Sequence, residues 1–127
     1  MLIATLIALL FLGSGANMML DGIDQTKDNI KAAIVDESTR KAALDIVDKL
    51  EDTAKDYAKA DSEDEKELLK LIQQYETTTA DLQKNMDASY EKRIQFQQEM
   101  LALRFELKDK LSREQWDKVF AEDKAAK

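Results

Sequence analysis

Residues 68–86, LLKLIQQYETTTADLQKNM, carry the pattern that decides the fold. Within this stretch, mostly apolar side chains return at alternating intervals of four and three residues. This spacing places them along one face of an α-helix and matches the seam positions of a coiled coil. The stretch therefore predicts a long helix that packs against a second helix, with a seam formed by Leu68, Ile72, Tyr75, Thr79, Leu82 and Met86.

The rest of the chain extends this helical interpretation. The 127 residues suffice for one domain, and they contain no proline and only three glycines, the last of which is Gly22. Turns and strand ends usually depend on glycine or proline, so a β-rich fold would lack the residues that its turns need. A charged content of 35% with only 6% aromatic residues is typical of helical bundles and coiled coils. The composition predicts an all-α fold.

The first half of this fold is expected to be one helix. From Ile23 onward, apolar residues recur at intervals of three and four, and the stripe continues through Val47 and Tyr57. Six polar residues, 36–41, interrupt its phase. They indicate either an exposed stretch of one helix or a break between two, and we favour continuity because glycine and proline are absent.

A capping box predicts where the second long helix begins. Ser62 is followed three residues later by Glu65, the arrangement in which a serine hydroxyl and a glutamate carboxylate cap a helix start. The first helix is then expected to end near Ala60, and the second to run from Glu63 to Leu111. So short a connection predicts an antiparallel hairpin.

A second capping box starts a short C-terminal helix. Ser112 precedes Gln115 by three residues, and Leu111 and Trp116 occupy the two positions of a hydrophobic staple. This helix is predicted from Arg113 to about residue 123. It is too short to be stable alone, so it must fold back on the hairpin or dock on something else.

The same five residues, Leu111-Ser112-Arg113-Glu114-Gln115, resemble the LTxxQ motif of the Spy/CpxP family of periplasmic helical proteins, with serine in place of threonine. The family carries the motif twice, whereas this chain has one copy. The resemblance implies a small secreted protein built on an antiparallel helical hairpin that forms a cradle-like dimer. It also implies a role in envelope stress and ATP-independent chaperone activity.

The stretch that begins at Met1 and ends at Leu20 contains no charged side chain. Its apolar part, residues 2–12, has the length of the hydrophobic region of a secretory signal peptide, and a small-residue triplet ending at Ala16 offers a cleavage site. Twenty uncharged residues would also span roughly 30 Å as a helix, about one bilayer core. Burial as a core helix is a third interpretation. The expected organisation is a signal peptide or membrane anchor at 1–20 and a single helical domain at 21–127, in the cell envelope.

Composition argues against several classes of function. The chain lacks histidine and cysteine, which removes the most common general base, thiolate chemistry and most transition-metal sites. A net charge of −7 disfavours nucleic acid, because phosphate binding requires a basic surface. No glycine-rich phosphate loop or EF-hand pattern occurs. We therefore expect no catalytic residues, no cofactor, no metal, no nucleic-acid partner and no small-molecule substrate.

The sequence thus predicts a non-catalytic interaction or structural subunit that is membrane-anchored or secreted. It would self-associate as a homo-oligomer or dock on a larger assembly through its helical seams, with a periplasmic ATP-independent chaperone of the Spy/CpxP type as the alternative. The aromatic pair Trp116 and Phe120 suits either an interface anchor or the closed end of the bundle's own core. The apolar face widens after Met86, and the predicted partner-binding residues are Phe96, Met100, Leu103, Leu107, Leu111, Trp116, Val119 and Phe120.

Overall fold

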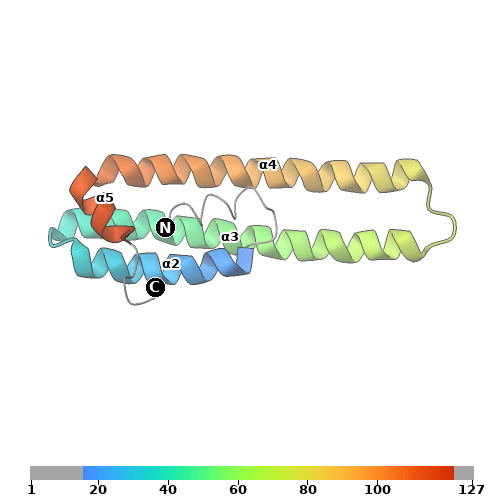
Figure 1. The fold of residues 1–127 in the computed structure, drawn as a ribbon. Coiled ribbons are helices and arrows are strands. Elements are labelled where there is room, and N and C mark those ends of the chain that lie inside the picture. The colour runs from blue at the N-terminus through green and yellow to red at the C-terminus, as the bar shows by residue number, and fades with distance from the viewer. Residues whose placement is uncertain (1–15, 122–127) are drawn as a thin grey trace.

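The computed structural model describes residues 16–121, with side chains from Leu20 onward, and this part of the chain consists of helices and short connections with no strand. It contains α2 (Ala16–Ala33), α3 (Glu37–Gln73), α4 (Thr79–Lys110) and α5 (Arg113–Val119). Helices α3 and α4 form a long antiparallel hairpin, α2 lies along the first half of α3, and α5 folds back at the same end (Figure 1). The predicted all-α class is confirmed. The predicted apolar helix falls mainly on residues 1–15, outside the described residues.

A break separates α2 from α3, so the expected continuity across residues 36–41 is wrong. Helix α2 ends at Ala33 and α3 begins at Glu37. Asp36 caps the new helix, because its carboxylate accepts hydrogen bonds from the Thr39 backbone N–H at 2.8 Å and from the Thr39 hydroxyl at 2.6 Å. The Thr39 hydroxyl and N–H also hold the pKa of Asp36 below its ordinary value. The polar interruption in the apolar stripe therefore marks a helix start.

Helix α3 continues without interruption past Ala60, so the predicted boundary at 60–63 and the cap at Ser62 are wrong. The acidic residues there serve another purpose. The Asp64 carboxylate accepts hydrogen bonds from Lys92 Nζ at 2.8 Å and from the Ser89 hydroxyl at 3.4 Å, both on α4. These contacts join the two helices of the hairpin midway along the part that α2 does not cover.

The hairpin turn lies at residues 74–78, inside the seam that the spacing assigned to one helix. The two residues that border it have ordinary negative φ angles, with Gln74 at φ −81°, ψ 123° and Thr78 at φ −94°, ψ 165°. Thr78 and Asp81 form a reciprocal capping box, in which the hydroxyl accepts from the Asp81 N–H at 3.2 Å and the carboxylate accepts from the Thr78 N–H at 3.1 Å. Neither boundary of this turn requires glycine or proline.

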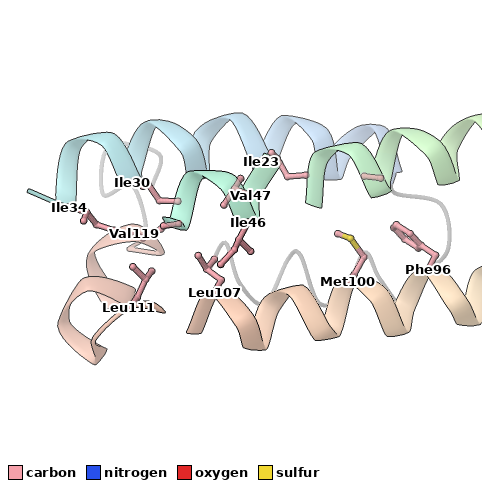
Figure 2. Packing of buried hydrophobic residues seen from close by; sticks show 12 residues of the cluster. Ile23, Ile30, Ile34, Ile46, Val47, Phe96, Met100, Leu107, Leu111 and Val119 are labelled. Atoms are coloured by element: carbon pink, nitrogen blue, oxygen red, sulfur yellow. The ribbon is translucent and has the colours of Figure 1, made fainter. Parts of the chain in front are cut away.

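The buried core occupies the end of the hairpin where all four helices meet (Figure 2). Side chains from α2, α3 and α4 point into one interior, and α5 closes its end with Val119. The core terminates at a stacked pair, Tyr57 on α3 and Phe96 on α4, whose ring centroids lie 4.2 Å apart at an interplanar angle of 8°. Its buried members are Ile23, Ile30, Ile34, Ala43, Ile46, Val47, Ala54, Phe96, Met100, Leu107, Leu111 and Val119.

Helix α5 begins as predicted but ends earlier. The capping box is confirmed: the Ser112 hydroxyl accepts from the Gln115 backbone N–H at 3.1 Å, and the Gln115 side-chain Oε1 accepts from the Ser112 backbone N–H at 2.9 Å. The helix ends at Val119, and Asn29 of α2 donates a hydrogen bond of 2.7 Å to the Val119 carbonyl. That bond satisfies one of the carbonyls that a helix end leaves unpaired, and it fixes α5 against α2.

Candidate interaction surface on the distal arm

Beyond the Tyr57–Phe96 stack the molecule narrows to two helices, residues 58–95, which we call the distal arm (Figure 1). The described part of α2 begins level with the start of the arm, so no third helix of residues 16–121 runs beside the arm. Seven large apolar side chains of the described residues are more than half exposed, and five of them lie on this arm. Such a concentration on one part of a small protein is typical of a surface that meets another molecule. The five are Leu69, Ile72, Tyr75, Met86 and Tyr90.

A groove runs along one side of the arm, between α3 and α4. It encloses about 550 Å³. Apolar side chains line it, namely Tyr57, Leu68, Met86 and Tyr90, and charged residues from both helices border it. An apolar groove with a polar border is the usual form of a site for an amphipathic or apolar helix.

The exposed side chains on α3 lie on the side of that helix that α2 covers nearer the core. Eighteen residues make five turns of an α-helix, so residues eighteen apart point in the same direction. Leu69 therefore points as Glu51 does, and the Glu51 carboxylate pairs with Lys27 of α2. Ile72 points as Ala54 does, yet Ala54 is 0% exposed and Ile72 is 61% exposed. The same face of α3 is covered in its first half and bare in its second.

Charged contacts fix where α2 lies along α3. Lys27 pairs with Asp48 at 2.8 Å and also with Glu51, which in turn pairs with Lys55 at 2.7 Å. The hydrogen bonds from Lys27 and then from Lys55 lower the pKa of Glu51 to about 2. Those that Lys27 donates to Asp48 and Glu51 raise its own pKa. The cluster holds α2 antiparallel to α3, with its N-terminal end directed toward the distal arm.

The residues predicted to bind a partner lie in or against the chain's own core. None of them lies on the distal arm, although Phe96 borders it. Trp116 and Phe120 have ring centroids 4.6 Å apart, and the guanidinium of Arg104 lies 5.0 Å from the Trp116 ring. Phe96, Met100, Leu107, Leu111 and Val119 are buried, whereas Leu103, Trp116 and Phe120 are partly buried against them. Their contact with a partner stays a prediction, and in this structure they hold the bundle together.

Some of the residues predicted to form the buried seam of the hairpin are instead exposed. Val47 is fully buried, but Ile72 and Met86, which were expected to hold the hairpin together, are 61% and 58% exposed. The spacing assigned both residues to one helix, but the turn at 74–78 places Ile72 on α3 and Met86 on α4. The two helices therefore pack together through other side chains. The distal arm instead uses Asp64, Lys92 and half-buried leucines between its helices.

None of the five exposed apolar residues of the distal arm was among the residues predicted to bind a partner. Sequence reasoning missed Leu69 and Tyr90, although Leu69 stands eighteen residues after Glu51 and continues the side of α3 that meets α2. Within residues 16–121 no group of three histidine, cysteine or acidic side chains is arranged to hold a metal ion. None of the four described helices combines the length and the apolar character needed to cross a bilayer.

Comparisons of the chain with models of protein families, with characterised proteins and with solved structures gave no match.

Proposed function

We propose that this protein is a non-catalytic interaction subunit of the cell envelope that docks on a protein partner, or on a second copy of itself, through the distal arm. The observation that carries the proposal is the bare apolar face of the arm. Five large apolar side chains there are more than half exposed, while the other end of the hairpin is closed by α2 and α5. Covering such a surface removes apolar area from water, which is the main favourable term in protein association.

The arm is built to present this face in a defined geometry. Its two helices are joined by the Asp64–Lys92 ion pair and closed by the Thr78 capping box, while the Tyr57–Phe96 stack anchors it to the core. Interfaces of this kind owe most of their affinity to a few large side chains at their centre. Ile72, Met86 and Tyr90 are the residues expected to have that role.

Self-association is the first test. Sedimentation velocity of the chain from Asn17 onward, over a wide range of concentration, should show a monomer–oligomer equilibrium. The double substitution Ile72→Ser and Met86→Ser should shift it toward monomer. Phe105→Ser is the matched control, because Phe105 is also exposed but lies on α4 outside the arm. A monomer at every concentration would refute the self-association part of the proposal.

Docking on another protein requires a test in the host. A photo-cross-linking amino acid placed at Ile72 should give one discrete product of defined mass in intact cells. The same amino acid at Asp45, an exposed residue on the closed part of α3, should not give that product. Equal labelling from both positions would mean that the arm has no special role.

A chaperone of the Spy/CpxP type is the second candidate. The Ser112–Gln115 capping box, which coincides with the LTxxQ-like motif, and the exposed apolar groove together favour it. Such a protein would hold unfolded clients without nucleotide. The chain from Asn17 onward should then suppress aggregation of an unrelated unfolded protein at near-stoichiometric ratio, and the Ile72→Ser, Met86→Ser variant should not. Two results together would favour a chaperone over a subunit that binds one specific partner. The variant would no longer suppress aggregation, and the photo-cross-linker at Ile72 would give no discrete product in cells.

Location in the envelope is part of the proposal and depends on residues 1–20. The intact mass of the protein from membrane and soluble fractions tests it. Loss of residues 1–16 in the soluble fraction supports secretion, and a full-length mass in the membrane fraction supports an anchor. A full-length chain found only in the soluble cytoplasmic fraction would refute it.

A further inference from the structure

We infer that copies of this chain associate head to tail, with the hairpin turn of one copy, residues 74–78, seated in a cationic pocket between α4 and α5 of the next copy. The inference rests on the proposed function for self-association, and it names the two surfaces that meet. The evidence is the open positive charge of the pocket, the exposed aromatic and acidic side chains of the turn, and the position of the two at opposite ends of the molecule.

The pocket lies at the closed end of the bundle, where α4 meets α5. It encloses about 340 Å³. Three cations line it, Arg104, Lys108 and Arg113, against one carboxylate, that of Asp117. Arg113 and Asp117 pair with each other at 3.5 Å, which leaves the other two cations in excess. In a chain with a net charge of −7, such a local excess of positive charge attracts an anionic group.

The two remaining cations have no counter-ion within residues 16–121. The Arg104 guanidinium lies 4.7 Å from the centre of the Phe105 ring and 5.0 Å from that of Trp116, and its N–H groups meet no acceptor among the described residues. The Lys108 ammonium, one helical turn later on α4, likewise forms no ion pair in that part of the chain. The rings thus hold the guanidinium in place while its donors stay open, and a carboxylate can accept two parallel hydrogen bonds from such a group.

The hairpin turn has the complementary chemistry. Tyr75 is fully exposed, and Glu76 beside it is exposed as well. Residues 71–83 carry two carboxylates and no cation, and one of the two, that of Asp81, already caps α4. The turn therefore offers an aromatic ring and one free carboxylate to a pocket that presents an indole ring and two open cations. Tyrosine, tryptophan and arginine are the side chains that most often dominate the affinity of a protein interface.

The turn and the pocket lie at opposite ends of the molecule (Figure 1). Helix α4 separates them by its 32 residues, about 48 Å, so the turn cannot reach the pocket of its own chain. Each copy therefore has both surfaces available for neighbouring copies. A contact between two unlike surfaces repeats from one copy to the next and produces either a ring or an open chain of molecules.

Charge favours this contact over side-by-side pairing of two distal arms. The groove of the arm is lined by four carboxylates and one guanidinium, those of Asp61, Asp64, Glu65, Asp87 and Arg93. Two arms placed groove to groove would bring like charges together, which opposes association. The turn and the pocket bring opposite charges together, so they can associate although the chain as a whole is acidic.

Cysteine cross-linking of the full chain in its host cells tests the contact, because the natural chain has no cysteine. One copy carries Gln74→Cys in the turn, and a second copy with a different tag carries Asp117→Cys in the pocket. The matched control for the second copy is Glu106→Cys, because Glu106 is also an exposed acid near this end of the molecule but lies on nearly the opposite side of α4 from Lys108. Intact cells are treated with a short, membrane-permeable bis-maleimide.

The expected result is a dimer of the two tagged chains whose yield from position 117 is several-fold above that from position 106. A single chain with cysteines at both 74 and 117 should give a ladder of dimers, trimers and larger species. Adding Glu76→Lys to the first copy should lower the yield of the dimer to that of the control, and adding Lys108→Glu to the second copy should restore it, because the exchange of charges re-forms an attractive pair.

Three results would overturn the inference: equal yields from positions 117 and 106, no product from either, or a product between two Gln74→Cys copies in place of the expected one. The last result would assign the turn to a symmetric contact. The photo-cross-link from Ile72 reports separately on docking through the face of the arm, so the proposed function can hold where this contact fails.

Discussion

The closed core and the open arm should differ in how much a leucine-to-alanine substitution lowers the free energy of unfolding. Leu107 on α4 is 2% exposed and Leu69 on α3 is 51% exposed. The chain that begins at Asn17 is the suitable background, because every described core residue follows it and residues 1–15 are absent. Both leucines are then changed to alanine.

The expected costs differ several-fold. Leu107→Ala should lower the free energy of unfolding by about 3–5 kcal/mol, because it removes buried methyl groups and leaves a cavity. Leu69→Ala should cost about 1 kcal/mol or less. Full burial of a leucine contributes about 2 kcal/mol, only half of this side chain is covered, and water fills the space it leaves.

Urea unfolding followed by circular dichroism at 222 nm gives both values, with the slope m as a check that the transition stays two-state. Equal costs for the two substitutions would refute the claim that the arm is open in the free chain. If the Leu69→Ala cost also depended on protein concentration, the arm would be buried against a second copy.

Four other predictions concern the contacts that build the fold and the stability of its parts. Glu51→Gln should lower the free energy of unfolding by about 1 kcal/mol at neutral pH, as for an ion pair near the surface. The pKa of Glu51 is about 2 in the folded chain against an ordinary 4.5, so this contribution is present above pH 4.5 and is lost as pH falls toward 2. The urea midpoints of wild type and variant should therefore converge across that window. Ser112→Ala should lower the unfolding free energy by about 1 kcal/mol through loss of the α5 cap. Ser62→Ala, in the middle of α3, should leave it unchanged or raise it by about 0.5 kcal/mol, and a cost equal to that of Ser112→Ala in thermal or urea unfolding would contradict the continuous helix. Backbone amides of the distal arm should exchange with deuterium faster than those of residues 96–110, and equal protection would show that the arm is as stable as the core.

Composition and spacing were enough to predict the fold class, because the chain after Gly22 contains neither residue that normally ends helices. They were less successful in placing the helix ends. Serine or threonine followed three residues later by an acid or glutamine occurs at 53–56, 62–65, 78–81 and 112–115, and only the last two are helix starts. At 62–65 the acid Asp64 is engaged by Lys92 of α4 instead, and that partner is 28 residues away in the sequence.

The hairpin turn illustrates the same limit. Its strongest sequence signal was the run of three threonines, which weakens helix propensity, yet the apolar spacing runs across it without a change of phase. Only the pairing of α3 with α4 shows that Ile72 and Met86 belong to different helices. A four-and-three repeat reports which residues share a helical face, but it does not report where the chain reverses.

The candidate surface could not be predicted from the same repeat, for a related reason. A stripe of apolar residues looks the same in sequence whether a neighbouring helix covers it or not, and exposure depends on how far that neighbour extends. Helix α2 covers α3 as far as about residue 60, so Ala54 is core and Ile72, at the same angular position, is surface. Among residues 16–121, the exposed surface of the arm therefore follows from the difference in length between α2 and α3, and that difference depends on where helices pair and not on the repeat itself.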